Sequence, residues 1–272
     1  ILVNFSISGG IGGGEFLSPT TGYTDAAGQV KTTFNSGLRS GVVQVVATAN
    51  VLGQTISVAS GRLTISGGFP DPTKVSATLS RVNMPGIAKR GPVGSLTVQV
   101  GDRFGNPVQP GTALSFSTTG GLVQSVAQTD ASGLATVVMQ GGFPTPNDPT
   151  LGPGYGIITL RTVGEGGTAI SRPTPFLFSG APRVTLQNVP TDTVRIFDAS
   201  SFDIDYTVAD INGNPVSGGH TVVVAVSGAG ASGITLSGDV NVNTPDTQDK
   251  VNFTRYRFRA ADNIINGGPS GE

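Results

Sequence analysis

The amino-acid sequence predicts an all-β protein made of tandem repeats, and three features support this. The chain of 272 residues contains 41 glycines and 18 prolines, and only 12% of its residues are charged. Such a composition suits short strands joined by tight turns and argues against coiled coils and all-α folds. Apolar and polar residues alternate in several segments, and similar segments recur along the chain.

Alternation with a period of two is clearest in two segments. Segment 95–100 reads SLTVQV, and segment 202–208 reads FDIDYTV. In a strand these patterns place apolar side chains on one face and polar side chains on the other. One buried and one solvated face is typical of an antiparallel sheet in a β-sandwich.

Internal repeats show how the strands are grouped. The recurring motifs are VNFSISGG (3–10) with LSFSTTGG (114–121), TDAAG (24–28) with TDASG (129–133), and DRFGNPV (102–108) with DINGNPV (210–216). Their shared order and a spacing of roughly 110 residues indicate a tandem array. A unit of about this length matches an immunoglobulin-like sandwich.

The motif positions predict three domains, at residues 1–67, 68–180 and 181–272. Proline-containing joints, GGFPDP and GAP, separate them and should be stiff, so we expect an elongated monomeric rod. The repeat alignment sets Ile1 opposite Thr112 and Gly268 opposite Gly152. The first repeat should therefore lack its opening strands and the third its last two, and each should expose an unpaired edge and part of its core.

The repeated motifs are interpreted first as turns. Asp25 and Gly28 have the residue types of a β-turn, and the Gly-Asn pairs before Pro107 and Pro215 tolerate positive φ. Calcium is the alternative at 210–214, because the sequence DINGN spaces oxygen ligands as a calcium loop does. Pro215 stands where such a loop needs glycine, which favours a turn.

The motif order resembles one known family. Asp-x-x-Gly-Asn-Pro-Val (102–108), Phe-Ser-Thr-Thr-Gly-Gly (116–121) and Thr-Asp-x-x-Gly-x-Ala-Thr (129–136) are similar to the bacterial immunoglobulin-like repeats of the intimin/invasin cell-adhesion family. The first repeat keeps the second and third motifs, and the third repeat keeps the first. The resemblance implies rigid surface rods that hold a binding tip away from the cell, and no segment here resembles the lectin-like tip of such proteins.

Catalysis has few candidate residues. His220 is the one histidine, the chain has no cysteine, and we expect a structural histidine at the start of a strand. One imidazole without thiolates cannot build a zinc centre. The cluster Gly9-Gly-Ile-Gly-Gly-Gly lacks the context of a phosphate loop and is expected to be a flexible loop. No enzyme activity, catalytic residue, cofactor site or metal site is therefore predicted.

Three arginines form the most specific candidate for a binding surface. Arg255, Arg257 and Arg259 alternate with aromatic residues and so line one face of a strand. They could bind an anionic glycan. The favoured interpretation is a charged outer face, laddered against Asp203 and Asp205 across the sheet.

The predicted function is a non-catalytic stalk segment of an adhesin-like protein, on the bacterial surface or secreted. Its partners would be neighbouring repeats, with an unidentified protein or glycan ligand bound elsewhere in the parent protein. A net charge of −1 gives no basic footprint for nucleic acid, and no apolar run is long enough to span a membrane. The alternative is a module that itself binds a host protein or polysaccharide, or that serves an extracellular enzyme.

Overall fold

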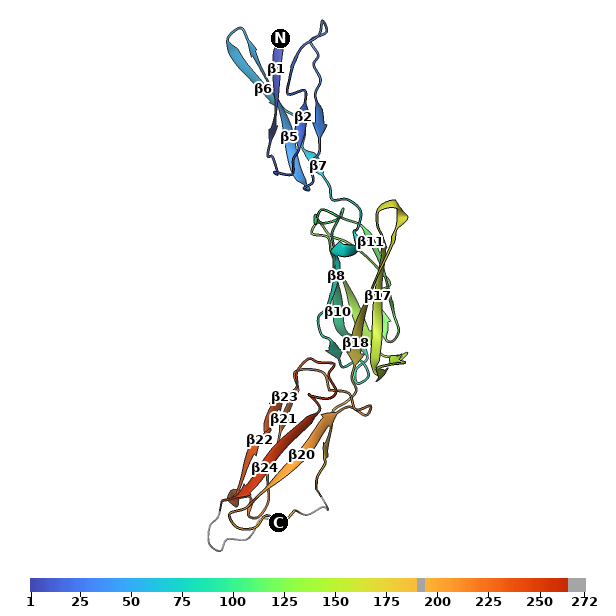
Figure 1. Ribbon diagram of the computed structural model, residues 1–272, viewed down its shortest axis with the longest axis vertical. Helices are drawn as coiled ribbons and strands as arrows, with labels where there is room; N and C mark the ends of the chain where they lie inside the picture. The colour runs from blue at the N-terminus through green and yellow to red at the C-terminus, as the bar shows by residue number, and fades with distance from the viewer. Residues whose placement is uncertain (190–193, 264–272) are drawn as a thin grey trace.

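The computed structural model describes residues 1–189 and 194–263 and confirms the all-β prediction. Figure 1 shows an elongated molecule in which three β-rich units follow one another along the long axis. Strand pairing in the described residues stays within residues 2–65, 75–178 and 183–262, which we call units 1, 2 and 3. The predicted joints lie between these blocks. The position of Gly268 in the repeat alignment lies outside the described residues.

Unit 2 has two sheets packed face to face. One sheet has the order β12-β14-β10-β8, and the other has the order β13-β11-β17-β18-β9, beside a small β15-β16 ribbon. The bounds are β8 (Val75–Leu79), β9 (Asn83–Met84), β10 (Gly91–Val100), β11 (Ala113–Thr118), β12 (Leu122–Val123), β13 (Val126–Gln128), β14 (Leu134–Gly141), β15 (Asn147–Asp148), β16 (Gly152–Pro153), β17 (Tyr155–Val163) and β18 (Ala169–Phe178). Short 3-10 helices occupy Pro72–Lys74 and Glu165–Gly167.

The core of unit 2 follows the alternation read from the sequence. Leu96, Val98 and Val100 on β10 are fully buried, and Thr97 and Gln99 point to the other face. On the facing sheet, Ile158 and Leu160 of β17 are also fully buried. Burying such side chains stabilises the sandwich by about 1.5–3 kcal/mol each.

Unit 1 contains one larger sheet, β3-β1-β5-β6 with β7 also on β5, and a β2-β4 ribbon. The bounds are β1 (Leu2–Ser8), β2 (Phe16–Ser18), β3 (Thr21–Tyr23), β4 (Thr33–Asn35), β5 (Gly41–Val51), β6 (Gln54–Ala59) and β7 (Leu63–Ile65). The pairing of β3, β1, β5 and β6 repeats that of β13, β11, β17 and β18 in unit 2. Unit 1 as described therefore has no counterparts of β8 and β10, as the repeat alignment predicts.

Unit 3 retains the other half of the sandwich. Its main sheet, β19-β20-β24-β22, repeats the order β8-β10-β14-β12, and a β21-β23 ribbon repeats β11-β13. The bounds are β19 (Arg183–Leu186), β20 (Ser201–Ala209), β21 (Thr221–Val223), β22 (Ile234–Gly238), β23 (Asn241–Asn243) and β24 (Arg255–Asp262), with a 3-10 helix at Ala231–Gly233. Counterparts of β17 and β18 are not present in the described residues.

Candidate functional site at the joints between units

The first joint is organised by the carboxylate of Asp102. Its Oδ1 accepts hydrogen bonds from the backbone N–H groups of Phe104 and Asn106, both at 2.9 Å, which closes the predicted turn. Its Oδ2 accepts from the N–H of Gly68, also at 2.9 Å. Because Gly68 belongs to the linker from unit 1, the turn of the Asp-x-x-Gly-Asn-Pro-Val motif also anchors the joint.

The pKa of Asp102 reflects these contacts. Burial raises it, but hydrogen bonds from Gly68, Asn106 and Phe104 outweigh burial and hold the pKa below its usual value. The carboxylate therefore stays charged at neutral pH while its oxygens accept from N–H donors.

Asn106 completes the first joint by reaching back to unit 1. Its Nδ2 donates to the carbonyl of Leu38 at 2.7 Å, and its Oδ1 accepts from the N–H of Ser40 at 3.2 Å. One amide side chain thus uses a donor and an acceptor across the joint. The linker also packs tightly against unit 2. A Cβ on Gly67 would lie only 1.8 Å from the carbonyl oxygen of Pro107, so this position has room for glycine alone.

The second joint repeats this arrangement. Asp210 Oδ1 accepts from the N–H groups of Asn212 (2.8 Å) and Asn214 (2.9 Å), and Oδ2 accepts from Gly180 of the linker (2.9 Å). Asn214 Nδ2 donates to the carbonyl of Pro153 in unit 2 at 2.9 Å. Leu38 stands three residues before Gly41, the first residue of β5, and Pro153 stands three residues before Gly156, the second residue of β17, so both asparagines bind equivalent carbonyls.

Asn83 adds a second contact to this joint. Its fully buried Nδ2 shares its two hydrogens among three carbonyls of unit 3, those of Pro215 (2.8 Å), Val216 (3.1 Å) and Thr247 (3.0 Å). Its backbone N–H donates in turn to Asp246 Oδ1 at 2.8 Å. In the described structure the buried Oδ1 atoms of Asn83 and Asn214 have no partner, so the amide nitrogens hold this joint.

Tyr155 and Gln248 close the same joint on another side. The Tyr155 hydroxyl donates to the carbonyl of Gln248 at 2.7 Å, and Gln248 Nε2 donates to the carbonyl of Val82 at 3.0 Å. Lys250 Nζ lies 4.9 Å from the centre of the Tyr155 ring. Burial, with Asp210 and Asp249 nearby, raises the pKa of Tyr155 and keeps its hydroxyl a donor.

The glycine cluster of unit 1, which was expected to be a flexible loop, is closed by the side chain of Glu15. The Glu15 carboxylate accepts from the N–H groups of Ile11 (2.6 Å), Gly12 (3.1 Å) and Gly13 (2.8 Å). Such consecutive N–H groups form a nest for an anion. Gly13 in turn accepts from the N–H of Leu38, so the closed loop supports the residue that Asn106 binds.

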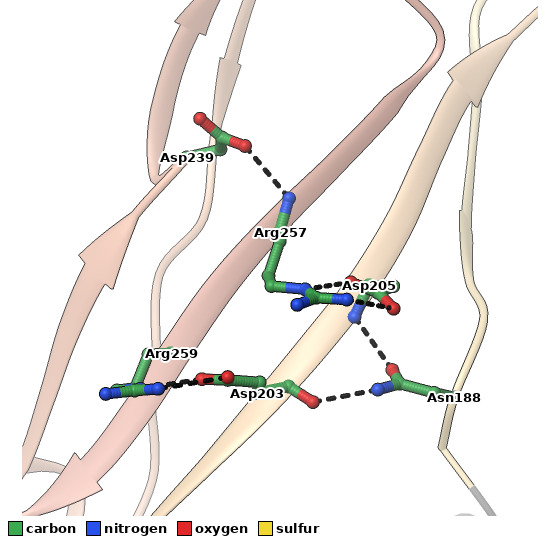
Figure 2. A network of polar contacts seen from close by, with 6 residues as sticks. All are labelled: Asn188, Asp203, Asp205, Asp239, Arg257 and Arg259. Carbon is green, nitrogen blue, oxygen red and sulfur yellow. Dashed lines mark hydrogen bonds and ion pairs between the residues drawn. The ribbon is translucent and has the colours of Figure 1, made fainter. Parts of the chain in front are cut away.

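The predicted Arg–Asp ladder is confirmed on the outer face of unit 3 (Figure 2). Arg257 binds Asp205 through Nε–Oδ1 (2.5 Å) and a second nitrogen at 3.1 Å. Arg259 binds Asp203 in the same bidentate manner, at 2.6 and 3.0 Å. Hydrogen bonds from the arginines lower the pKa of both carboxyl groups.

The last residue singled out in the sequence is the histidine of unit 3. His220 is exposed, directly before β21, and its Nε2 lies 3.2 Å from Ser217 Oγ. No three acidic or histidine side chains of residues 1–189 and 194–263 gather as metal ligands would. No helix in these ranges is both long and apolar enough to cross a membrane.

Sequence reasoning missed the contacts of Asn106, Asn214, Asn83 and Glu15. The recurrence of asparagine in both DxxGNPV motifs was a signal for the first two. For Asn83 and Glu15 the sequence gives no comparable signal, because neither lies in a repeated motif.

Comparison with known proteins identifies no family model that matches this chain and no curated protein that matches it. Similar solved structures include the D0–D1 domain of intimin, with 21% identity over 65% of this chain and 81% of that one (TM-score 0.28). Invasin, described as a bacterial integrin-binding protein, has 20% identity over 97% of this chain (TM-score 0.38). The adhesin InvE of Yersinia pseudotuberculosis has 19% identity over 72% of this chain (TM-score 0.32).

The chain spans 48% of the invasin structure and 53% of the InvE structure. In motif order and in all-β architecture, this chain resembles the bacterial immunoglobulin-like repeats of the intimin/invasin family.

Proposed function

We propose that this chain is a non-catalytic stalk segment of an adhesin-like protein at the bacterial surface or secreted from the cell. Its units, with domain boundaries near 1–67, 68–180 and 181–272, act as spacers that keep their relative orientation. Adhesion by the parent protein is assigned to other parts of that protein.

The observation that carries this proposal is the pair of buried amide contacts at the second joint. Asn214 is fully buried and donates to Pro153, and Asn83 is fully buried with its Nδ2 within hydrogen-bonding distance of three carbonyls of unit 3. Bending the joint would separate these groups, and a buried polar group left without a partner costs about 1–3 kcal/mol. Such contacts favour one orientation of the units over many.

The carboxylates support a structural role over a catalytic one. Both oxygens of Asp102 and both of Asp210 accept hydrogen bonds from N–H donors of turn and linker. A carboxylate held in this way orders the backbone and is not placed to act as a general base.

Distance measurements between spin labels test the proposal. The chain has no cysteine, so Gln99→Cys with Ser237→Cys places labels on exposed positions of units 2 and 3 without background labelling. We expect a narrow distance distribution that Asn83→Ala broadens. Asn241→Ala, an exposed position in unit 3, is the matched control and should leave the distribution narrow. A broad distance distribution in the labelled chain that carries neither alanine substitution would contradict the stalk proposal.

A further inference from the structure

The third cross-strand pair of the Arg–Asp ladder in unit 3 lacks a carboxylate. We call this pair, Thr207 and Arg255, the open rung. Strands β20 and β24 pair so that Asp203 stands opposite Arg259, Asp205 opposite Arg257, and Thr207 opposite Arg255. The first two rungs are bidentate ion pairs (Figure 2), whereas Thr207 offers Arg255 no carboxylate. Arg255 is exposed and, within the described ranges, forms no ion pair.

The positive charge on this face that no aspartate balances therefore lies at Arg255. Arg257 and Arg259 are neutralised by their aspartates, but the guanidinium of Arg255 is always charged and presents its planar set of donors to solvent. A guanidinium of this kind binds a carboxylate through two parallel hydrogen bonds. The open rung is suited to a carboxylate from outside the chain.

A hollow of about 580 Å³ surrounds the open rung. Its lining side chains with hydrogen-bonding groups are those of Gln187, Asp205, Tyr206, Thr207, Asp239, Arg255, Tyr256 and Arg257. The size is within the range of small-ligand sites in proteins. Gln187 Nε2 lies 3.4 Å from Thr207 Oγ1, so amide and hydroxyl groups stand beside the arginine.

The lining distinguishes a saccharide from a bare anion and from a peptide. The Asp239 carboxylate, whose Oδ2 accepts from the backbone N–H of Arg257, can also accept from a hydroxyl group, which a bare anion does not offer. Strand β20 is paired with β19 and β24 on its two sides, so it offers an added peptide strand no free edge. The ligand must then be recognised through side chains.

We propose that the open rung of unit 3 binds a carboxylated saccharide of the uronic acid type. Arg255 binds the sugar carboxylate, and Gln187, Thr207 and Asp239 hydrogen-bond its hydroxyl groups. This site is separate from the joints and does not depend on the stalk function.

Titration of the full chain with potassium D-glucuronate, followed by NMR chemical shifts, tests the site. We expect saturable binding that D-glucose fails to reproduce at tenfold higher concentration. Arg255→Gln should weaken binding at least about tenfold, because a charge-assisted bidentate contact is lost. Thr207→Asp should abolish binding by supplying the missing carboxylate of the third rung, and Thr207→Ser is its matched control that retains binding.

The other outcomes each count against the proposal. Unchanged affinity of Arg255→Gln, with melting temperature preserved, would overturn the site. Acetate binding as tightly as glucuronate would reduce it to a bare anion site and overturn the saccharide assignment. Tighter binding of an acidic tetrapeptide would assign the surface to peptides instead. Thermal melts of every variant separate loss of binding from loss of folding.

Discussion

Asn106 and Asn214 make the same contact at successive joints: the Nδ2 of each donates to a backbone carbonyl of the preceding unit, Leu38 at 2.7 Å and Pro153 at 2.9 Å. Each asparagine also directs its Nδ2 to the aspartate that begins its motif, at 3.1 Å for Asp102 and 3.4 Å for Asp210. One seven-residue motif thus forms a turn, anchors the linker that precedes it and holds its own unit to the preceding unit.

Removing these amides should weaken the two joints unequally. Asn214 is fully buried, whereas Asn106 is half-buried, so water can replace the partner of Leu38 more readily than that of Pro153. We expect Asn214→Ala to lower stability by about 1–3 kcal/mol and Asn106→Ala by about 0.5–1.5 kcal/mol. Scanning calorimetry of the two variants measures the difference, and a larger effect for Asn106→Ala would contradict the role of burial.

The fold was predictable because its signals are local. Alternation in segments 95–100 and 202–208 sets which side chains of β10 and β20 face inward, and the Asp-x-x-Gly pattern closes turns within a few residues. The Arg–Asp ladder was also predictable, since two alternating charged strands of one sheet need only pair in register. Each of these depends on neighbouring residues or on one strand pair.

The joints were not predictable in detail because their contacts connect distant residues. Asn106 and Leu38 are 68 residues apart, and Asn83 and Pro215 are 132 residues apart. Such contacts depend on how whole units are oriented, which no local pattern records. The closed glycine loop was missed for a different reason: the nest forms only because the Glu15 carboxylate folds back on three N–H groups.

The Arg–Asp ladder should make unit 3 sensitive to acid. Arg259 and Arg257 lower the pKa of Asp203 and Asp205 in the folded chain, while an unfolded aspartate titrates near about 3.9. The ladder's stabilisation is therefore complete above about pH 4 and is lost as the pH falls through the lowered folded pKa.

Melting temperatures from about pH 5 down to about pH 2 measure this loss. The double variant Asp203→Asn/Asp205→Asn should show a smaller acid-induced decrease than the unchanged chain. Asp198→Asn, an exposed position in the same unit, is the control and should follow the unchanged chain. Identical profiles for the double variant and the unchanged chain would show that the ladder adds no pH-dependent stability.

Asp102→Asn should loosen the first joint at neutral pH. The substitution replaces one carboxylate oxygen by an amide group, which cannot accept from all of the N–H groups of Gly68, Phe104 and Asn106. With labels at Asn4→Cys and Gln99→Cys, we expect a broader distance distribution than in the parent chain. The parent should broaden in the same way as the pH falls through the folded pKa of Asp102, which lies below its usual value, because the contribution of the charged carboxylate is then lost. No broadening in either case would mean that the linker alone sets the orientation.

Hydrogen exchange should rank unit 2 as the most protected part of the chain. The main core cluster of unit 2 contains 16 buried side chains, and the corresponding cluster in the described residues of unit 3 contains four.

Side-chain exposure shows the same difference between the units. It is higher on β6 and β19, which lack a covering sheet, than on the corresponding strands of unit 2. Val58 on β6 is 65% exposed, whereas Ile170 at the equivalent position of β18 is 2% exposed. Val184 on β19 is 58% exposed, against 8% for Val75 on β8.

The free energy of local opening rises with buried apolar contact, so amides of β10, β14 and β17 should exchange slowest and those of β6 and β19 far faster. The measurement uses a dilute sample, because uncovered faces that pack against a second molecule would gain protection with concentration. Equal, high protection of β6, β19 and β10 in a dilute monomer would show that the strand correspondence between the units is wrong.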